Sequence, residues 1–124
     1  MSARLAMQVL EAGRVVIGGA LVAAPVAAAE PWIGDAAHTP GGQVAVRALG
    51  IRDAVLGVGA LAAATRGDAA TAARWAAALA VCDVVDGLAT IGARSELPSR
   101  GVPVTAIALG AAATGFAVAA ALRD

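Results

Sequence analysis

The sequence contains a single cysteine, Cys82, and a single histidine, His38. One cysteine excludes an internal disulfide bond and any CxxC metal or redox motif. His38 is followed by Thr-Pro-Gly-Gly, a run that is typical of a loop. A haem with two histidine ligands and a histidine-rich metal site are therefore not expected. The sequence predicts no metal ion and no cofactor.

Lysine is absent, because all nine basic residues are arginines, and nine acidic residues balance them to a net charge of zero. This balance argues against electrostatic binding of nucleic acid, which needs a basic surface. The exclusive use of arginine, together with the abundance of alanine, is typical of high-GC bacterial genes. We therefore expect a bacterial protein with no nucleic-acid partner.

Hydrophobic residues make up 60% of the chain and charged residues 15%, whereas soluble domains have about 45–50% and about 25%. A soluble fold of 124 residues has too little interior to bury this excess. The apolar residues form four segments, each close to the roughly 20 residues that a helix needs to cross a bilayer. The segments cover approximately residues 4–29, 44–64, 71–92 and 102–122.

These segments predict an all-α integral membrane four-helix bundle, with four transmembrane helices, antiparallel neighbours and one domain over residues 1–124. The sequence shows no soluble domain, repeat or linker. Pro25 is expected to kink the first helix or to end its last full turn. Trp32 and Trp75 are expected to anchor the helices at membrane interfaces.

The first segment has an alternative interpretation as a secretory signal. Arg14, the apolar run after it, Pro25 and Ala27-Ala28-Ala29 together resemble such a signal with its A-x-A cleavage site. Glu11 and the length of the region before the apolar run argue against this interpretation. We therefore expect an uncleaved membrane helix.

The arginines near the helix ends predict the orientation, because cytoplasmic loops carry an excess of positive charge. With the N-terminus inside, the cytoplasmic side holds Arg4, Arg14, Arg66, Arg74 and Arg123. The far side holds only Arg94 and Arg100. This distribution predicts a multi-pass protein of the bacterial inner (cytoplasmic) membrane with both termini in the cytoplasm.

Charged residues lie inside the second and third apolar segments, namely Arg47, Arg52, Asp53, Asp83 and Asp86. Each costs roughly 2.5–3.5 kcal/mol at the centre of a bilayer unless it is paired. An antiparallel hairpin about the polar turn between these segments places Arg52 level with Asp83, and Arg47 level with Asp86. We therefore predict these two ion pairs.

Three other charged residues have different expected positions. Asp53 lies about 100° around the helix from Arg52 and is expected to face another helix. Arg14, at the cytoplasmic end of the first helix, is not expected to reach the cluster. Instead, Arg14 and Glu11 are expected to form a surface pair.

The charged cluster has two interpretations. In the first, the pairs only fix the register and facing of the helices. In the second, the carboxylate left in excess is functional, and Asp53 or Asp83 acts as an acid or a base. Arg47, Arg52 and Asp86 then complete a polar cluster that contacts the substrate.

Asp83-Val84-Val85-Asp86-Gly87 resembles the start of the metal-binding signature of the CDP-alcohol phosphotransferases. In this sequence Ala93-Arg94 comes later than that signature requires, and the downstream glycine and paired aspartates are missing. The chain is also too short for that fold. The segment therefore does not change the prediction that the protein holds no metal.

Residues 47–57, with the pattern R-x-x-G-x-R-D-x-x-L-G, resemble a segment of a family of small, uncharacterised bacterial four-helix membrane proteins. The chain resembles DoxX-type four-helix proteins more loosely. The resemblance implies a fold and a topology, and no activity. It also implies that one site is formed by Arg47, Gly50, Arg52, Asp53, Gly57, Asp83 and Asp86.

Three functions remain open. The first is an accessory or structural membrane subunit, with a homo-oligomer or another membrane protein as its partner. The second is a small membrane enzyme that performs acid–base chemistry, such as isomerisation or cyclisation, on an apolar small molecule. The third is a carrier of protons or small solutes, which the uncharged fourth segment and the absence of inverted repeats disfavour.

Overall fold

The computed structural model describes all 124 residues, and its first helix begins at a capping serine. Helix α1 (Ala3–Ala23) follows Ser2, whose hydroxyl accepts a hydrogen bond from the amide of Leu5. The helix is interrupted at Ala24, and α2 (Pro25–Ile33) starts with Pro25 in its first turn. The predicted helix over residues 4–29 is therefore two helices, because the ring of Pro25 is compatible with a first turn and not with a helix interior.

Two long helices follow the short helix η1 (Gly34–His38). Helix α3 (Pro40–Arg66) is capped by the hydroxyl of Thr39, and the left-handed Gly67 ends it. Helix α4 (Ala69–Gly92) is capped by Asp68, whose carboxylate accepts hydrogen bonds from the amide and the hydroxyl of Thr71. These hydrogen bonds hold the pKa of Asp68 below its ordinary value.

The last helix begins after a tight connection. Two short helices, η2 (Arg94–Glu96) and η3 (Pro98–Gly101), lead into α5 (Val102–Ala121). Ser99, Arg100 and Gly101 all have positive φ, so the chain reverses direction within a few residues. The structure confirms an all-α fold. The bounds predicted for the third and fourth segments, 71–92 and 102–122, nearly coincide with those of α4 and α5.

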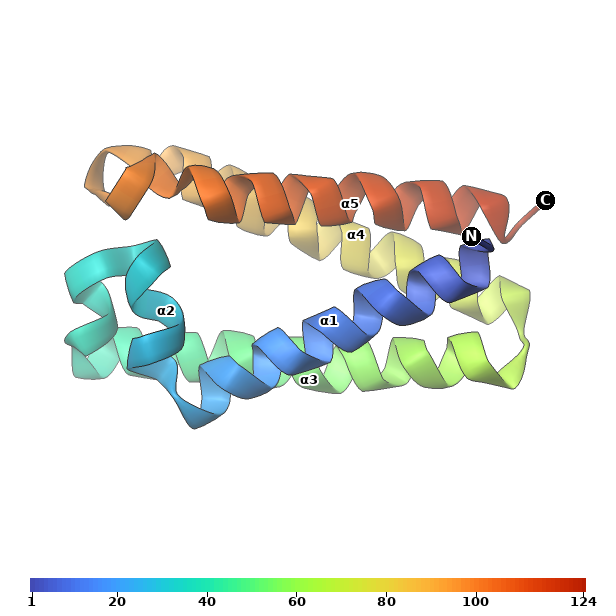
Figure 1. Cartoon of the computed structure of the whole chain (residues 1–124), viewed down its shortest axis with the longest axis horizontal. Coiled ribbons are helices and arrows are strands. Elements are labelled where there is room, and N and C mark those ends of the chain that lie inside the picture. Colours follow the sequence, from blue (N-terminus) through green and yellow to red (C-terminus); the bar gives the residue numbers. More distant parts are fainter.

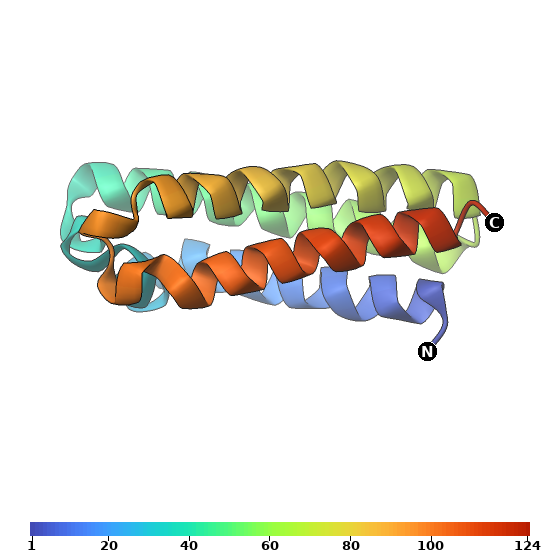
Figure 2. The same cartoon turned by 90° about the horizontal axis from the view of Figure 1, so that it is seen from above.

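The four long helices form two pairs, with α1 packed along α3 and α4 packed along α5 (Figure 1). Both termini and the turn between α3 and α4 lie at one end of the molecule (Figures 1 and 2). At this end α1 approaches the second pair, and towards the other end the two pairs diverge. Helix α2 and η1 occupy the space between the pairs at that second end.

Glycines permit the close contact of α1 with α3. A Cβ atom on Gly18 would lie 2.5 Å from the carbonyl oxygen of Gly50, and one on Gly50 would lie 2.7 Å from that of Gly18. Both distances are shorter than any real contact, so no larger residue fits without moving a helix. This contact fixes α1 on α3, one turn of α1 beyond Arg14.

Apolar residues cluster at both ends of the bundle. Met7, Leu79 and Val118, with several alanines, form a cluster near the termini. Leu21, Ala29, Ala37 and Val46 form a second cluster near α2. The buried charged residues lie between the two clusters.

Three helical segments are long and apolar enough to cross a membrane, namely Ala3–Ala23, Ala69–Gly92 and Pro98–Ala121. These segments indicate a membrane protein. The sequence predicted four such helices, and α3 is the exception, because Arg47, Arg52 and Asp53 lower its hydropathy. Large apolar side chains nevertheless point outward from α3, among them Ile51, Val55 and Val58.

Candidate functional site

A buried arginine on α1 connects the two helix pairs. The Nη1 and Nη2 atoms of Arg14 donate to the two carboxylate oxygens of Asp83 on α4, at 2.8 and 2.7 Å. Its Nε atom donates to Glu11 at 2.8 Å. The side chains of all three residues are buried, with no more than 8% of any one exposed. Arg14 is therefore saturated by two carboxylates from two helices.

This geometry brings Arg14 to the cluster, which was not expected, and it overturns two of the predicted pairs. Asp83 pairs with Arg14 and not with Arg52, and the Glu11–Arg14 pair is buried and not on the surface. Arg14 was not among the predicted site residues. It lies near the middle of α1, which ends at Ala23, and its central position in the predicted segment over residues 4–29 is the signal that could have identified it.

Arg52 holds two carboxylates of its own. Its Nη2 atom donates to Asp86 at 2.7 Å and to Asp53 at 2.9 Å, and its Nε atom donates to Asp53 at 3.1 Å. The observed partner Asp86 lies about one helical turn beyond the predicted partner Asp83. Asp53 was expected to face another helix, and its Cβ atom does lie against Gly18 of α1. Its carboxylate nevertheless accepts hydrogen bonds from the neighbouring Arg52, which was not expected.

Arg47 lies outside the cluster. Its side chain is exposed and donates to the carbonyl oxygen of Val22 on α1 at 3.3 Å. The predicted pair between Arg47 and Asp86 does not form. Arg47 thus connects α3 to the end of α1 and has no contact with the buried carboxylates.

The cluster holds more acidic than basic groups. Four carboxylates surround two guanidinium groups, which are those of Arg14 and Arg52. Asp53 and Asp86 share Arg52, and each uses only one oxygen to do so. The second oxygen of each of these two carboxylates has no hydrogen-bond partner within the protein.

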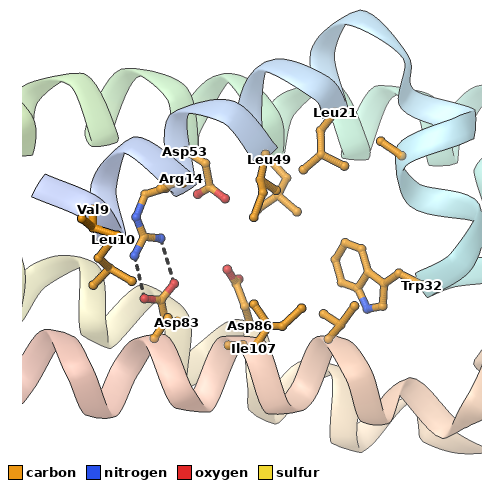
Figure 3. Close-up of a pocket in the computed structure, with 16 residues that line it drawn as sticks. Val9, Leu10, Arg14, Leu21, Trp32, Leu49, Asp53, Asp83, Asp86 and Ile107 are labelled. Carbon is orange, nitrogen blue, oxygen red and sulfur yellow. Dashed lines mark hydrogen bonds and ion pairs between the residues drawn. The ribbon is translucent and has the colours of Figure 1, made fainter. Parts of the chain in front are cut away.

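These two carboxylates point towards each other and are held close together, because both accept a hydrogen bond from the same Nη2 atom of Arg52. Both line a cavity of about 470 Å³ between the helix pairs (Figure 3). A pocket of this size is in the range of about 300–1,000 Å³ that is typical for small-molecule sites. Arg14 and Asp83 lie on the wall of the cavity beside Asp53 and Asp86. The rest of the wall is apolar and consists mainly of Val9, Leu10, Ile17, Leu21, Leu49, Trp32, Val104, Ile107, Ala108 and Ala111.

Trp32 lies at the end of the cavity away from the Arg14–Asp83 pair (Figure 3). Its indole N–H donates to the hydroxyl of Thr90 at 3.3 Å, and that hydroxyl donates to the backbone carbonyl of Asp86 at 2.8 Å. The sequence analysis assigned Trp32 only to a membrane interface. In the structure this side chain contributes an aromatic wall to the cavity.

The cavity reaches the outer surface between α1 and α5. Val9 and Ile17 of α1 and Ile107 of α5 line the cavity, and each is 51–61% exposed. An apolar rim therefore surrounds the opening, and the charged groups lie deeper inside.

The remaining residues implied by the resemblance have packing roles. Gly50 contacts Gly18, and Gly57 lies against Val15 and the backbone of Glu11. Neither glycine lines the cavity. No group of three or more histidine, cysteine, aspartate or glutamate side chains is placed to hold a metal ion.

Comparison with protein-family models, with curated proteins and with solved structures finds no match. The resemblance in residues 47–57 therefore stays a prediction. The function must be argued from the geometry of the cavity and of its charged wall.

Proposed function

We propose that this protein is a bacterial inner-membrane protein that binds an apolar small molecule in the cavity between its helix pairs. The observation that carries the proposal is the cavity itself, with its apolar wall, its apolar opening and two carboxylates with free oxygens inside. A molecule dissolved in the bilayer would enter between α1 and α5 without passing through water.

In this proposal α3 is a fourth transmembrane helix. Its 27 residues are long enough to cross. Its charged Arg52 and Asp53 are paired with each other and with Asp86, which offsets the cost of placing them in lipid. Both termini then lie on the cytoplasmic side, together with Arg4, Arg66, Arg74 and Arg123.

The two arginine clusters have different roles in this proposal. Arg14, with Glu11 and Asp83, is buried and saturated, so it serves to hold the two helix pairs together. Asp53 and Asp86 share one guanidinium and face the cavity, so they contact the bound molecule. Of the two acid–base candidates predicted from the sequence, Asp53 is retained and Asp83 is replaced by Asp86.

A second candidate function is acid–base catalysis on the bound molecule, and the facing positions of Asp53 and Asp86 favour it. One ionised carboxylate would remove a proton from one carbon of the substrate, and the other, protonated, would give a proton to another carbon. The sum is an isomerisation with no net change in protons. Arg52 would stabilise the charge on whichever aspartate is ionised.

The accessory-subunit and carrier functions also remain predictions. A partner subunit or second copy would pack on the exposed apolar face of α5, which includes Ile107, Leu109 and Phe116. A carrier needs polar access from the cluster to both faces of the membrane. The apolar cluster around Met7 and Leu79 lies between the charged residues and the termini, which argues against such a path.

Native mass spectrometry of the protein, extracted gently from its membrane, tests the binding function. The proposal predicts a monomer or small oligomer that carries one reproducible non-lipid mass, and D53N and D86N reduce its occupancy. Asp35→Asn is a matched control, because Asp35 is exposed in η1 and does not line the cavity. A complex with a second polypeptide, with no such mass, would instead support the accessory subunit.

A further inference from the structure

We infer that the molecule bound in the cavity carries a positive charge on a bulky apolar frame, as in a lipophilic tertiary or quaternary ammonium compound. This inference rests on the proposed binding function and specifies its ligand class. It excludes fatty acids, anionic phospholipid head groups and other anions as the main ligand.

The first argument is the balance of charge. Both guanidinium groups are already occupied, since Arg14 donates to Glu11 and Asp83, and Arg52 donates to two aspartates. Four carboxylates facing two arginines leave the cluster with an excess of negative charge when all are ionised. An anionic ligand would find no free cation in the cavity and would be repelled by these carboxylates.

The second argument is the position of the unused oxygens. Asp53 and Asp86 approach the cavity from opposite sides, α3 and α4, and each keeps one oxygen without a partner (Figure 3). Arg52 bridges the two bonded oxygens from one side, so a ligand cation in the cavity would contact the two carboxylates from the other side. In a membrane interior this contact also offsets the cost of the excess negative charge.

The third argument is the rest of the wall. Leu21, Leu49, Ile107 and the ring of Trp32 surround the space beyond the carboxylates. The cavity holds about 470 Å³, so the part of the ligand that lies inside it is compact, of the size of a few rings. An indole ring is also the aromatic side chain that most favours a nearby cation.

Tetraphenylphosphonium and tetraphenylborate provide the test, because these ions have the same shape and opposite charges. Their binding to the protein purified in a neutral maltoside detergent is measured by equilibrium dialysis against detergent alone. We expect saturable binding of tetraphenylphosphonium, at least ten-fold tighter than that of tetraphenylborate. We further expect D53N and D86N each to weaken phosphonium binding at least ten-fold, with Asp35→Asn unchanged.

The wild-type comparison of the two ions does not depend on whether the variants fold. If tetraphenylborate binds as tightly as tetraphenylphosphonium, the cavity still binds apolar molecules, and the inferred charge of the ligand is wrong. If neither ion shows saturable binding, both the inference and the proposed binding function are overturned. Folded D53N and D86N variants that bind tetraphenylphosphonium with unchanged affinity would also overturn the inference.

Discussion

Arg14 of α1 donates two parallel hydrogen bonds to both carboxylate oxygens of Asp83 on α4, across the space between the two helix pairs. Helices α1 and α4 have few other contacts, because α1 packs on α3 and α4 packs on α5. This ion pair and the pair between Arg52 of α3 and Asp86 of α4 therefore connect the two halves of the bundle, and the cavity lies directly beside them.

Removal of either side chain of the Arg14–Asp83 pair should destabilise the protein strongly. We expect Arg14→Leu and Asp83→Leu each to lower the free energy of unfolding by about 3–5 kcal/mol, because each leaves a buried charge unpaired. The double variant should lose clearly less than the sum of the two. Unfolding in detergent, followed by circular dichroism, measures the three values, and strictly additive losses would show that the pair contributes no coupling.

The close contact of Gly18 with Gly50 should also make the stability of the protein sensitive to a substitution at position 18. Gly18→Ala places a Cβ atom 2.5 Å from a backbone oxygen of α3, so we expect a loss of about 1–3 kcal/mol from overpacking. The adjacent Gly19 has open space around it and serves as the control. Gly19→Ala should leave stability unchanged or raise it by up to about 1 kcal/mol, since alanine favours helix. Equal effects of the two substitutions would contradict the observed facing of α1.

The topology of α3 can be tested with single cysteines. In a Cys82→Ser background, a cysteine replaces Asp68 in the turn before α4 or Ser99 in the connection before α5. If α3 and α4 both cross the membrane, an impermeant thiol reagent added to intact cells labels position 99 and not position 68. Labelling of position 68 from outside would contradict the proposed four-helix topology.

Asp68 should make the stability of the protein depend on pH. Its pKa is lower in the folded state than in the unfolded chain, because its carboxylate accepts hydrogen bonds from Thr71. The stabilisation is therefore complete above the ordinary aspartate pKa of 3.8 and is lost as pH falls through the lower folded value. The difference in Tm between wild type and D68A should shrink over that range. A difference that stays constant with pH would show that the ionised carboxylate is not responsible.

The sequence predicts the helices well and their facing poorly. Segment length and the polar turn at residues 65–68 indicate approximately where α3 and α4 lie. The start of α3 was placed too late, because Thr39-Pro40-Gly41-Gly42 was interpreted as a loop, whereas Thr39 caps a helix that begins at Pro40.

The ion pairs depend instead on the rotation and tilt of each helix. The hairpin prediction compared only the depths of residues and included neither rotation nor tilt. The hairpin also leaves out α1, which packs on α3 through Gly18 and Gly50 and brings Arg14 to Asp83.

The cavity could not be predicted, because it arises from the divergence of two helix pairs and not from any single segment. Small side chains at Ala108 and Ala111 of α5 leave the space open, yet they are indistinguishable in sequence from the many alanines that face outward. Trp32 reaches the cavity only because Pro25 redirects the chain into α2. The excess of carboxylates over arginines, in contrast, was already visible in the sequence.

The measurement that tests the central claim most directly is whether the small molecule still binds after a large side chain has been placed in the cavity. Ala111 lines the cavity, and Ala113 on the same helix is exposed on the surface. Native mass spectrometry of Ala111→Phe and Ala113→Phe should show the bound small molecule with Ala113→Phe and its loss with Ala111→Phe, with both proteins folded and monodisperse. Retention of the molecule by folded Ala111→Phe would contradict the claim that it binds between the helix pairs.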